Sequence, residues 1–205
     1  MGKIKRVLLD FDGTLYNTQQ FHAEAEAALM SGWGVVIDPA EVSKRFAGRP
    51  TEEIFMEVLG CERAVGEKLA AMKWEAIFER VSEAKELCDL YTFFEKLQQK
   101  NIKLSIGTAS PARWVHEILR LHRLERFFEY GSIVGGDMVS RGKPHPDIWQ
   151  KAARGTAPEC CLVVEDGIAG IEGAGVAGMP SALLLPRTHP GASSITTLWD
   201  IFGLL

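Results

Sequence analysis

Short apolar segments alternate along much of this chain with stretches whose apolar residues recur at helical spacing. The apolar segments predict buried strands at residues 4–9, 103–108, 132–134, 161–164 and 181–185. Helices are predicted between the later strands at residues 91–99, 111–121, 146–154 and 169–177. Strands that are separated by helices return to the same sheet by crossover connections. The alternation therefore predicts an α/β fold with a doubly wound parallel sheet.

The stretch from residue 17 to 86 departs from this alternation, because it contains no strand pattern. Its apolar residues fall at helical spacing, as in Phe21, Ala25 and Leu29. Four helices are predicted there: one that ends at residue 32, then 41–46, 51–59 with Thr51 as its N-cap, and 64–81. We therefore expect a core domain of residues 1–16 and 87–205 that carries an inserted helical domain of residues 17–86.

Composition and charge narrow the possible partners. Of the 205 residues, 46% are hydrophobic and 24% are charged, which is typical of a globular protein in water. A formal net charge of -4 predicts no broad basic face for nucleic acid or an anionic membrane. The apolar runs are too short to span a bilayer, and the four cysteines form no Cys-x-x-Cys pair. We expect a cytoplasmic protein with reduced thiols.

Polar residues gather where the predicted strands end. The residues concerned are Asp10, Asp12, Thr108, Ser110, Lys143, Glu165 and Asp166. The carboxyl ends of parallel strands meet at one edge of a sheet, so these side chains are expected to share a crevice. Carboxylates this close together need a cation, a shared proton or well-aimed hydrogen-bond donors. Carboxylates, a hydroxyl and an ammonium group in one crevice predict a site for a phosphoryl group and a divalent cation.

Simpler structural roles remain open for several of these residues. Asp12 is followed by Gly13, which is a common turn pair, and Glu165 with Asp166 could form a solvated turn after a strand. Ser110 precedes Pro111, so it could serve as the N-cap of the helix that follows. A helix N-cap and a phosphate ligand are compatible roles for the same serine.

Four motifs in order give the chain a resemblance to a known family. The segment Asp10-Phe-Asp12-Gly-Thr-Leu, Thr108 after an apolar strand, Lys143-Pro144 and Glu165-Asp166-Gly167 resemble the four motifs of the haloacid dehalogenase superfamily. The resemblance covers nearly the whole chain and points to the phosphohydrolase branch whose helical cap follows the first motif. It implies a Rossmann-like α/β core with an inserted helical cap domain.

The resemblance also implies a mechanism and a set of site residues. Asp10 would attack a small phosphomonoester, such as a sugar phosphate or a phosphoglycolate-like molecule, to form an aspartyl-phosphate. Asp12 would act as acid and base, which needs a raised pKa and a side chain outside the metal's coordination shell. The resemblance further implies that Mg²⁺ is bound by Asp10, Asp12 (through its carbonyl), Glu165 and Asp166. Thr108 and Lys143 would take part in catalysis. Substrate would be bound by Gly13, Ala109, Ser110, His22 and Arg49.

Three functions remain in order of preference. Asp12 favours phosphoryl transfer over dehalogenation, because dehalogenases of the superfamily lack a second aspartate there. A phosphatase comes first, and a mutase similar to β-phosphoglucomutase comes second, because His22 and Arg49 match cap positions of that mutase. A phosphate-binding protein without turnover comes third. In each case we expect a small phosphorylated metabolite as the partner and a monomer or weak dimer.

Overall fold

Six parallel strands form one sheet in the order β3-β2-β1-β4-β5-β6. The computed structural model describes residues 3–205. The strands are β1 (Arg6–Leu9), β2 (Lys103–Gly107), β3 (Ile133–Val134), β4 (Cys161–Glu165), β5 (Ser181–Leu184) and β6 (Ser193–Ile195). The five strands expected from the sequence are confirmed in these positions. The sixth, β6, extends the sheet beyond β5.

The central strand β1 fixes the position of the sheet edge at which the polar residues gather. All four of its residues are buried, and it pairs with β2 on one side and β4 on the other. Its last residue, Leu9, lies opposite Ile106 of β2 and Val164 of β4. The residues that follow these three strands therefore begin at the same level of the sheet, which brings their side chains together.

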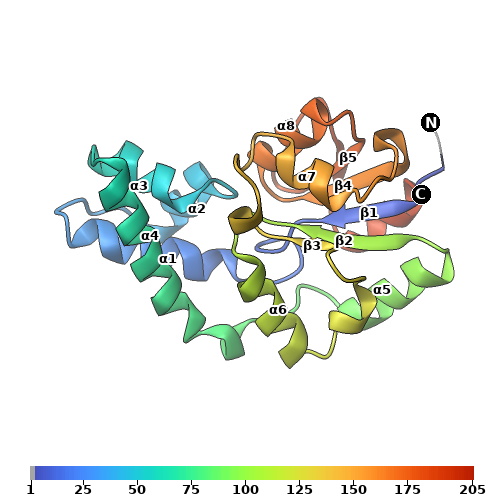
Figure 1. Ribbon diagram of the computed structural model, residues 1–205, viewed down its shortest axis with the longest axis horizontal. Coiled ribbons are helices and arrows are strands. Elements are labelled where there is room, and N and C mark those ends of the chain that lie inside the picture. The colour runs from blue at the N-terminus through green and yellow to red at the C-terminus, as the bar shows by residue number, and fades with distance from the viewer. Residues whose placement is uncertain (1–2) are drawn as a thin grey trace.

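Helices cover both faces of the sheet (Figure 1). One face packs against α5 (Leu90–Gln99) and α6 (Ala112–Leu121), and the other against α7 (Asp147–Ala152) and α8 (Ile168–Val176). The side chains of β1 alternate between these layers, since Val7 and Leu9 join the α5/α6 core and Leu8 joins the α7/α8 core. Helices on both faces confirm the predicted doubly wound architecture.

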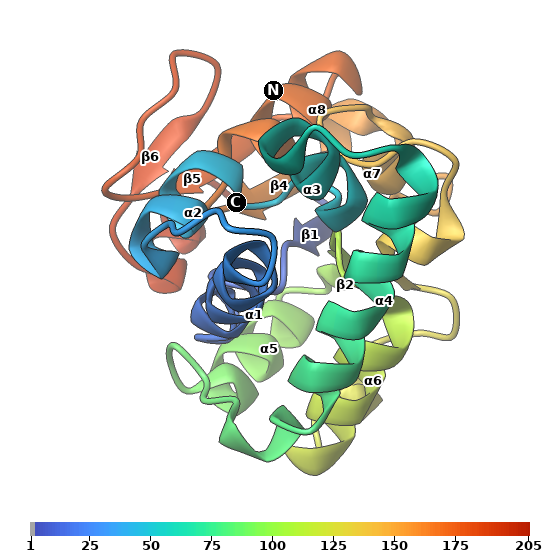
Figure 2. The same cartoon turned by 90° about the vertical axis from the view of Figure 1, so that its left-hand side faces the viewer.

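Four helices between β1 and α5 form a separate group, here called the α1–α4 bundle. It consists of α1 (Gln19–Ser31), α2 (Pro39–Phe46), α3 (Thr51–Leu59) and α4 (Arg63–Phe78). Met30, Phe46, Phe55 and Leu69 belong to an apolar core of its own. The bundle stands at one end of the molecule, and the view onto this end shows α1, α3 and α4 in front of the sheet (Figures 1 and 2).

The two chain segments that connect the bundle to the sheet run side by side. Leu87 N–H donates to the carbonyl of Leu15 at 2.9 Å, and Asn17 N–H donates to the carbonyl of Lys85 at 3.0 Å. The Asn17 side-chain oxygen accepts from Lys85 N–H at 2.8 Å. These bonds tie the entry and the exit of the bundle to each other.

Short 3₁₀ segments complete the secondary structure, and one helix start differs from its prediction. The 3₁₀ segments are Val81–Glu83, Glu125–Phe127, Gly136–Met138, Pro158–Cys160 and Leu198–Gly203. Thr51 is the first residue of α3 and Pro50 is its N-cap, so the predicted capping role of Thr51 is wrong. Within residues 3–205 no helix has the length and apolar character needed to cross a bilayer.

Candidate active site

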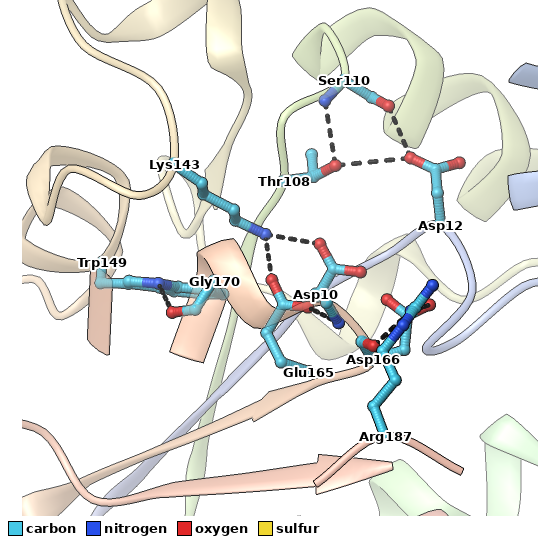
Figure 3. A network of polar contacts seen from close by, with 11 residues as sticks. Asp10, Asp12, Thr108, Ser110, Lys143, Trp149, Glu165, Asp166, Gly170 and Arg187 are labelled. Carbon is cyan, nitrogen blue, oxygen red and sulfur yellow. Dashed lines mark hydrogen bonds and ion pairs between the residues drawn. The ribbon is translucent and has the colours of Figure 1, made fainter. Parts of the chain in front are cut away.

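A buried lysine joins two of the motif carboxylates. Lys143 Nζ lies 2.6 Å from Asp10 Oδ1 and 2.6 Å from Glu165 Oε1, and its side chain has no exposed surface. Burial alone lowers the pKa of a lysine, but the charges of Asp10 and Glu165 outweigh it and raise the pKa of Lys143 above its ordinary value. Lys143 therefore carries a permanent positive charge beside Asp10 (Figure 3).

Asp10, Glu165 and Asp166 form a cluster that one lysine does not neutralise. Each offers an oxygen within 4.8 Å of the others. Burial, followed by the charge of Glu165, raises the pKa of Asp166 to about 7 and also raises the pKa of Asp10. Hard divalent cations such as Mg²⁺ bind carboxylate oxygens, and a cation here would remove the repulsion that raises these pKa values. The donor set therefore fits the Mg²⁺ site expected from the sequence.

Two glycines make room for the cluster. Gly13 has a φ of +90°, and a Cβ on it would lie 2.5 Å from Asp166 Oδ2. A Cβ on Gly170 in α8 would lie 1.8 Å from Glu165 Oε1. Glu165 is held in place by Gly167 N–H, which donates to its Oε2 at 2.7 Å. Gly13 packs against Asp166 and is not among the residues that line the cavity described below, and its role in substrate binding stays a prediction.

Asp12 points away from the carboxylate cluster toward Thr108 and Ser110 (Figure 3), and other donors also surround it. Its Oδ1 accepts from Thr18 at 2.5 Å and from Trp114 Nε1 at 2.9 Å, and lies 3.2 Å from His22 Nε2. Its Oδ2 accepts from Ser110 at 2.5 Å. Burial acts to raise the pKa of Asp12, but these donors, His22 foremost, outweigh it and lower the pKa. The raised pKa expected for this residue is therefore wrong for this arrangement.

The segment after β2 supplies hydroxyl groups rather than the helix cap that the sequence allowed. Ser110 donates its hydroxyl to Asp12, and Pro111 is the N-cap residue of α6. The first free N–H of α6, at Ala112, donates to Asp137 Oδ1 at 2.9 Å. The N-cap role considered for Ser110 is therefore wrong. Thr108 Oγ1 accepts from Ser110 N–H at 3.1 Å and donates to Asp12 Oδ2 at 3.4 Å.

A cavity of about 40 Å³ separates the sheet edge from the α1–α4 bundle. It has room for about three water molecules at most. The sheet edge contributes Asp10, Asp12, Thr108, Ala109 and Ser110 to its lining, and the bundle contributes residues that include His22, Glu26, Arg49, Thr51, Lys73 and Trp74. Both bundle residues expected at the site, His22 and Arg49, line this cavity. Arg49 pairs with Glu57 at 2.8 Å.

Several residues of the site carry no sequence motif. Thr18 and Trp114 hold Asp12, and Glu26, Thr51 and Lys73 form a polar cluster in the bundle wall. Arg187, after β5, donates to the carbonyl of Asp166 at 2.5 Å and approaches its Oδ2 at 3.3 Å. These residues come from distant segments of the chain. The sequence gives a signal for Lys73 alone, because it is a charged residue at a buried position of a helix.

Known proteins are similar to this chain in sequence and in fold. Residues 7–184 match the family model of haloacid dehalogenase-like hydrolase. The chain is 30% identical to the phosphorylated carbohydrates phosphatase of Thermotoga maritima, across 86% of this chain and 82% of that protein. It is 29% identical to the β-phosphoglucomutase of Bacillus subtilis, across 86% and 81%. A solved family IA hydrolase of Entamoeba histolytica has a TM-score of 0.83 at 27% identity, across 97% and 95%.

Proposed function

Since this chain belongs to the haloacid dehalogenase-like hydrolases, we propose that it is a Mg²⁺-dependent phosphatase of a small phosphomonoester, with Asp10 as nucleophile. Three observations support the proposal: the placement of Lys143 on Asp10, the carboxylate cluster, and the similarity to a phosphatase of phosphorylated carbohydrates. In this proposal residues 1–16 and 87–205 form the core and residues 17–86 form the cap. We also propose a cytoplasmic location, which the four free cysteines support.

Asp10 performs the first chemical step. One of its carboxylate oxygens forms a bond to phosphorus while the bond from phosphorus to the ester oxygen breaks, which leaves an aspartyl-phosphate and an alcohol. Lys143 offsets the negative charge that Asp10 and the phosphoryl group bring together, and it also orients Asp10. Asp10, Glu165 and Asp166, with the carbonyl of Asp12, would hold Mg²⁺, which would supply further positive charge beside the phosphoryl oxygens.

Asp12 moves the protons of both steps. In the arrangement seen here it accepts several hydrogen bonds and is ionised, which suits the base that takes a proton from the water attacking the aspartyl-phosphate. To protonate the leaving alcohol it must first hold a proton, and this needs fewer donors around it. Thr18 and His22 lie at the start of the bundle, so a shift of the bundle withdraws them from Asp12.

The contact of Lys143 with Asp10 and Glu165 is the observation that carries this proposal. The test measures phosphate release from a panel of phosphomonoesters, with Mg²⁺ and with EDTA. Wild-type protein is expected to release phosphate only with Mg²⁺, and Asp10→Asn is expected to abolish release. Glu95→Gln, on the exposed surface of α5, is the matched carboxylate-to-amide control and should keep full activity. Equal release by Asp10→Asn and wild type would disprove the nucleophile assignment.

A sugar-phosphate mutase is the second candidate. The similarity to the β-phosphoglucomutase of Bacillus subtilis and the position of His22 and Arg49 in the cavity wall support it. Against it, Arg49 is paired with Glu57, and Pro111 stands where the resemblance to the mutase implies a phosphate-contacting lysine. The test is isomerisation of β-glucose 1-phosphate in the presence of a sugar bisphosphate activator. Isomerisation faster than phosphate release would make the mutase the main activity.

A further inference from the structure

One of the hydrogen-bond donors around Asp12 is an indole that comes from a helix of the sheet layer. Trp114 of α6 donates its Nε1–H to Asp12 Oδ1 at 2.9 Å, and both residues are less than a tenth exposed. Thr18, which donates to the same oxygen, is the residue that precedes α1 of the bundle. Helix α6 packs on the sheet, as part of the apolar core that includes β1. We therefore expect the bond from Trp114 to persist when the bundle shifts and Thr18 withdraws.

Burial of the indole does not by itself explain its choice of partner. A buried indole N–H needs an acceptor, and a main-chain carbonyl is sufficient. This is the case for Trp149, whose Nε1 donates to the carbonyl of Gly170 at 2.9 Å. Trp114 instead donates to the carboxyl group that is proposed to move protons. Since Trp114 is not among the residues that line the cavity, any effect it has on the reaction acts through Asp12.

The indole makes the two oxygens of Asp12 different from each other. An indole N–H donates and cannot accept, whereas a hydroxyl group does both. Asp12 Oδ1 therefore remains an acceptor toward Trp114 whether or not Asp12 carries a proton. Asp12 Oδ2 lies 2.5 Å from Ser110 Oγ and 3.4 Å from Thr108 Oγ1, on the side where these residues line the cavity (Figure 3). Both hydroxyls are able to turn and accept a hydrogen bond from a protonated Oδ2.

We propose that Trp114 is a positioning residue whose N–H fixes the rotation of the Asp12 carboxyl group, so that Oδ2 is the oxygen that exchanges protons during the reaction. In the first step the O–H bond at Oδ2 breaks, and its proton joins the ester oxygen as the bond from phosphorus to that oxygen breaks. In the second step the oxygen of water bonds to phosphorus, the bond from phosphorus to Asp10 breaks, and Oδ2 takes the proton from that water. The inference rests on the proposed phosphatase function, since it concerns proton transfer in that reaction.

The proposal predicts a loss of activity that depends on the leaving group. Proton transfer matters most where the leaving oxygen is strongly basic, as in an alkyl ester, and least where an electron-withdrawing ring stabilises the leaving anion. Trp114→Phe keeps an aromatic ring on α6 and removes the N–H, so the Asp12 carboxyl group rotates more freely. A merely structural effect would lower the activity toward all esters alike, because they all react with the same Asp10 beside the same Lys143.

The first test compares kcat/KM for p-nitrophenyl phosphate, phenyl phosphate and glycerol 3-phosphate, whose leaving groups become more basic in that order. This ratio covers the steps up to the aspartyl-phosphate, so it reports proton donation to the leaving group. In Trp114→Phe we expect a loss of less than about threefold for p-nitrophenyl phosphate and of about tenfold or more for glycerol 3-phosphate. Trp199→Phe is the same substitution in the core beside Phe93, and it should keep the wild-type values.

The second test detects the hydrogen bond itself without turnover. The indole N–H signal that Trp114→Phe removes from the nitrogen–proton NMR spectrum should lie at high frequency, because its acceptor is a carboxylate. Asp12→Asn makes the acceptor neutral and should move that signal to lower frequency. Asp137→Asn is the control, since Asp137 accepts from α6 through Ala112 N–H at 2.9 Å, and it should leave the signal in place. If Trp114→Phe fails to fold, the signal is identified as the one that moves only in Asp12→Asn.

The outcomes separate this inference from the proposed function. Equal losses for the three esters in Trp114→Phe, or no loss, would overturn the inference and leave the phosphatase standing. An indole spectrum that is the same in wild type and Asp12→Asn would overturn it as well, because Trp114 would then not donate to Asp12. If wild type releases phosphate from none of the esters, the proposed function fails and the role of Trp114 in proton transfer fails with it, whatever the spectrum shows of the bond.

Discussion

At the scale of single residues, Lys143 is the group on which both stability and activity depend. It is fully buried and is the only cation within 4 Å of Asp10 and Glu165 among residues 3–205. Lys143→Met leaves two buried carboxylates without their partner, so we expect a loss of about 3–5 kcal/mol in the free energy of unfolding. Phosphate release should fall by about a hundredfold or more. Urea denaturation and phosphate assays measure the two effects.

The control for this prediction is another lysine in a salt bridge. Lys103 pairs with Glu129 at 3.0 Å, but its side chain is 58% exposed. Exposed ion pairs contribute little to stability, so Lys103→Met should change the free energy of unfolding by less than about 1 kcal/mol. Similar losses in the two variants would show that burial of Lys143 against Asp10 and Glu165 is not what makes it important.

The raised pKa of Asp166 predicts how stability of the metal-free protein depends on pH. Burial and Glu165 raise this pKa from 3.8 to about 7, so the folded state binds a proton more tightly than the unfolded state. This contribution to stability is fully present below pH 3.8 and is lost as the pH rises through 7. If the cluster binds Mg²⁺ as proposed, the cation takes the place of the lost proton. In thermal unfolding, the Tm gain from Mg²⁺ over EDTA should therefore be larger at pH 8 than at pH 5.5.

Two results would contradict the pH prediction. One is a Tm gain from Mg²⁺ that stays the same between pH 5.5 and pH 8, because proton and metal would then not compete for one site. The other is an undiminished gain in Asp166→Asn, which lacks the carboxylate. Glu172 of α8 is exposed and does not belong to the carboxylate cluster. Glu172→Gln should therefore retain the wild-type pH dependence.

Single residues of this site were predictable where a strand end marked them. Asp10, Glu165 and Asp166 directly follow or end buried strands, so their meeting followed from the parallel sheet. The state of Asp12 was not predictable, because Thr18 and His22 approach it from the start of α1 and Trp114 approaches it from α6. A pKa depends on such neighbours in space, and local sequence does not record them.

At the scale of elements, Arg187 links the loop after β5 to the bundle. Its Nη1 donates to the carbonyl of Asp166 at 2.5 Å, and its Nη2 donates to the carbonyl of Ser43 in α2 at 3.3 Å. Arg187→Ala removes both bonds, so we expect faster amide hydrogen exchange in α2 and no change in α5. Arg120→Ala, at an exposed position on α6, is the control. Unchanged exchange in α2 would show that Arg187 does not restrain the bundle.

Elements with a strong apolar pattern were found from the sequence, and weakly patterned ones were not. The buried strands β1, β2 and β4 and the helices of the bundle lie close to their predicted positions. Strand β6 was missed because two of its three residues are exposed serines, and a short strand at the sheet edge has little apolar signal. Thr51 was misassigned because a threonine at a helix start suits an N-cap, while its actual partners lie on α1 and α4.

At the scale of the whole molecule, the size of the cavity favours a bundle that moves. A cavity of about 40 Å³ is small for a phosphomonoester, so we expect the bundle to shift from the sheet edge when substrate enters. The sequence predicted that residues 17–86 form an inserted helical unit. It did not predict how closely this unit covers the site, because that depends on contacts between side chains of the bundle and of α6.

Contacts between tryptophans across this boundary make the movement measurable. The ring centroids of Trp74 in α4 and Trp114 in α6 are 6.2 Å apart, and Trp114 is fully buried. Opening of the bundle separates the two rings and exposes Trp114 to water, which shifts its fluorescence emission to longer wavelength. Mg²⁺ with orthovanadate, a phosphate mimic that Lys143 and the carboxylate cluster would hold, is expected to favour the closed form and to shift emission to shorter wavelength.

The tryptophan variants identify the source of this signal. Trp74→Phe removes one ring of the pair, so the shift on adding Mg²⁺ and orthovanadate should become smaller. Trp199→Phe is the matched control. Trp199 packs on the rings of Phe93 and Phe202 in the core, and its aromatic neighbours include no ring from the bundle. An equal shift in wild type and Trp74→Phe would place the conformational change elsewhere. The mimic is expected to contact the sheet edge under a closed bundle. If Mg²⁺ and orthovanadate leave the emission of the wild-type protein unchanged, closure of the bundle over the phosphoryl group is contradicted.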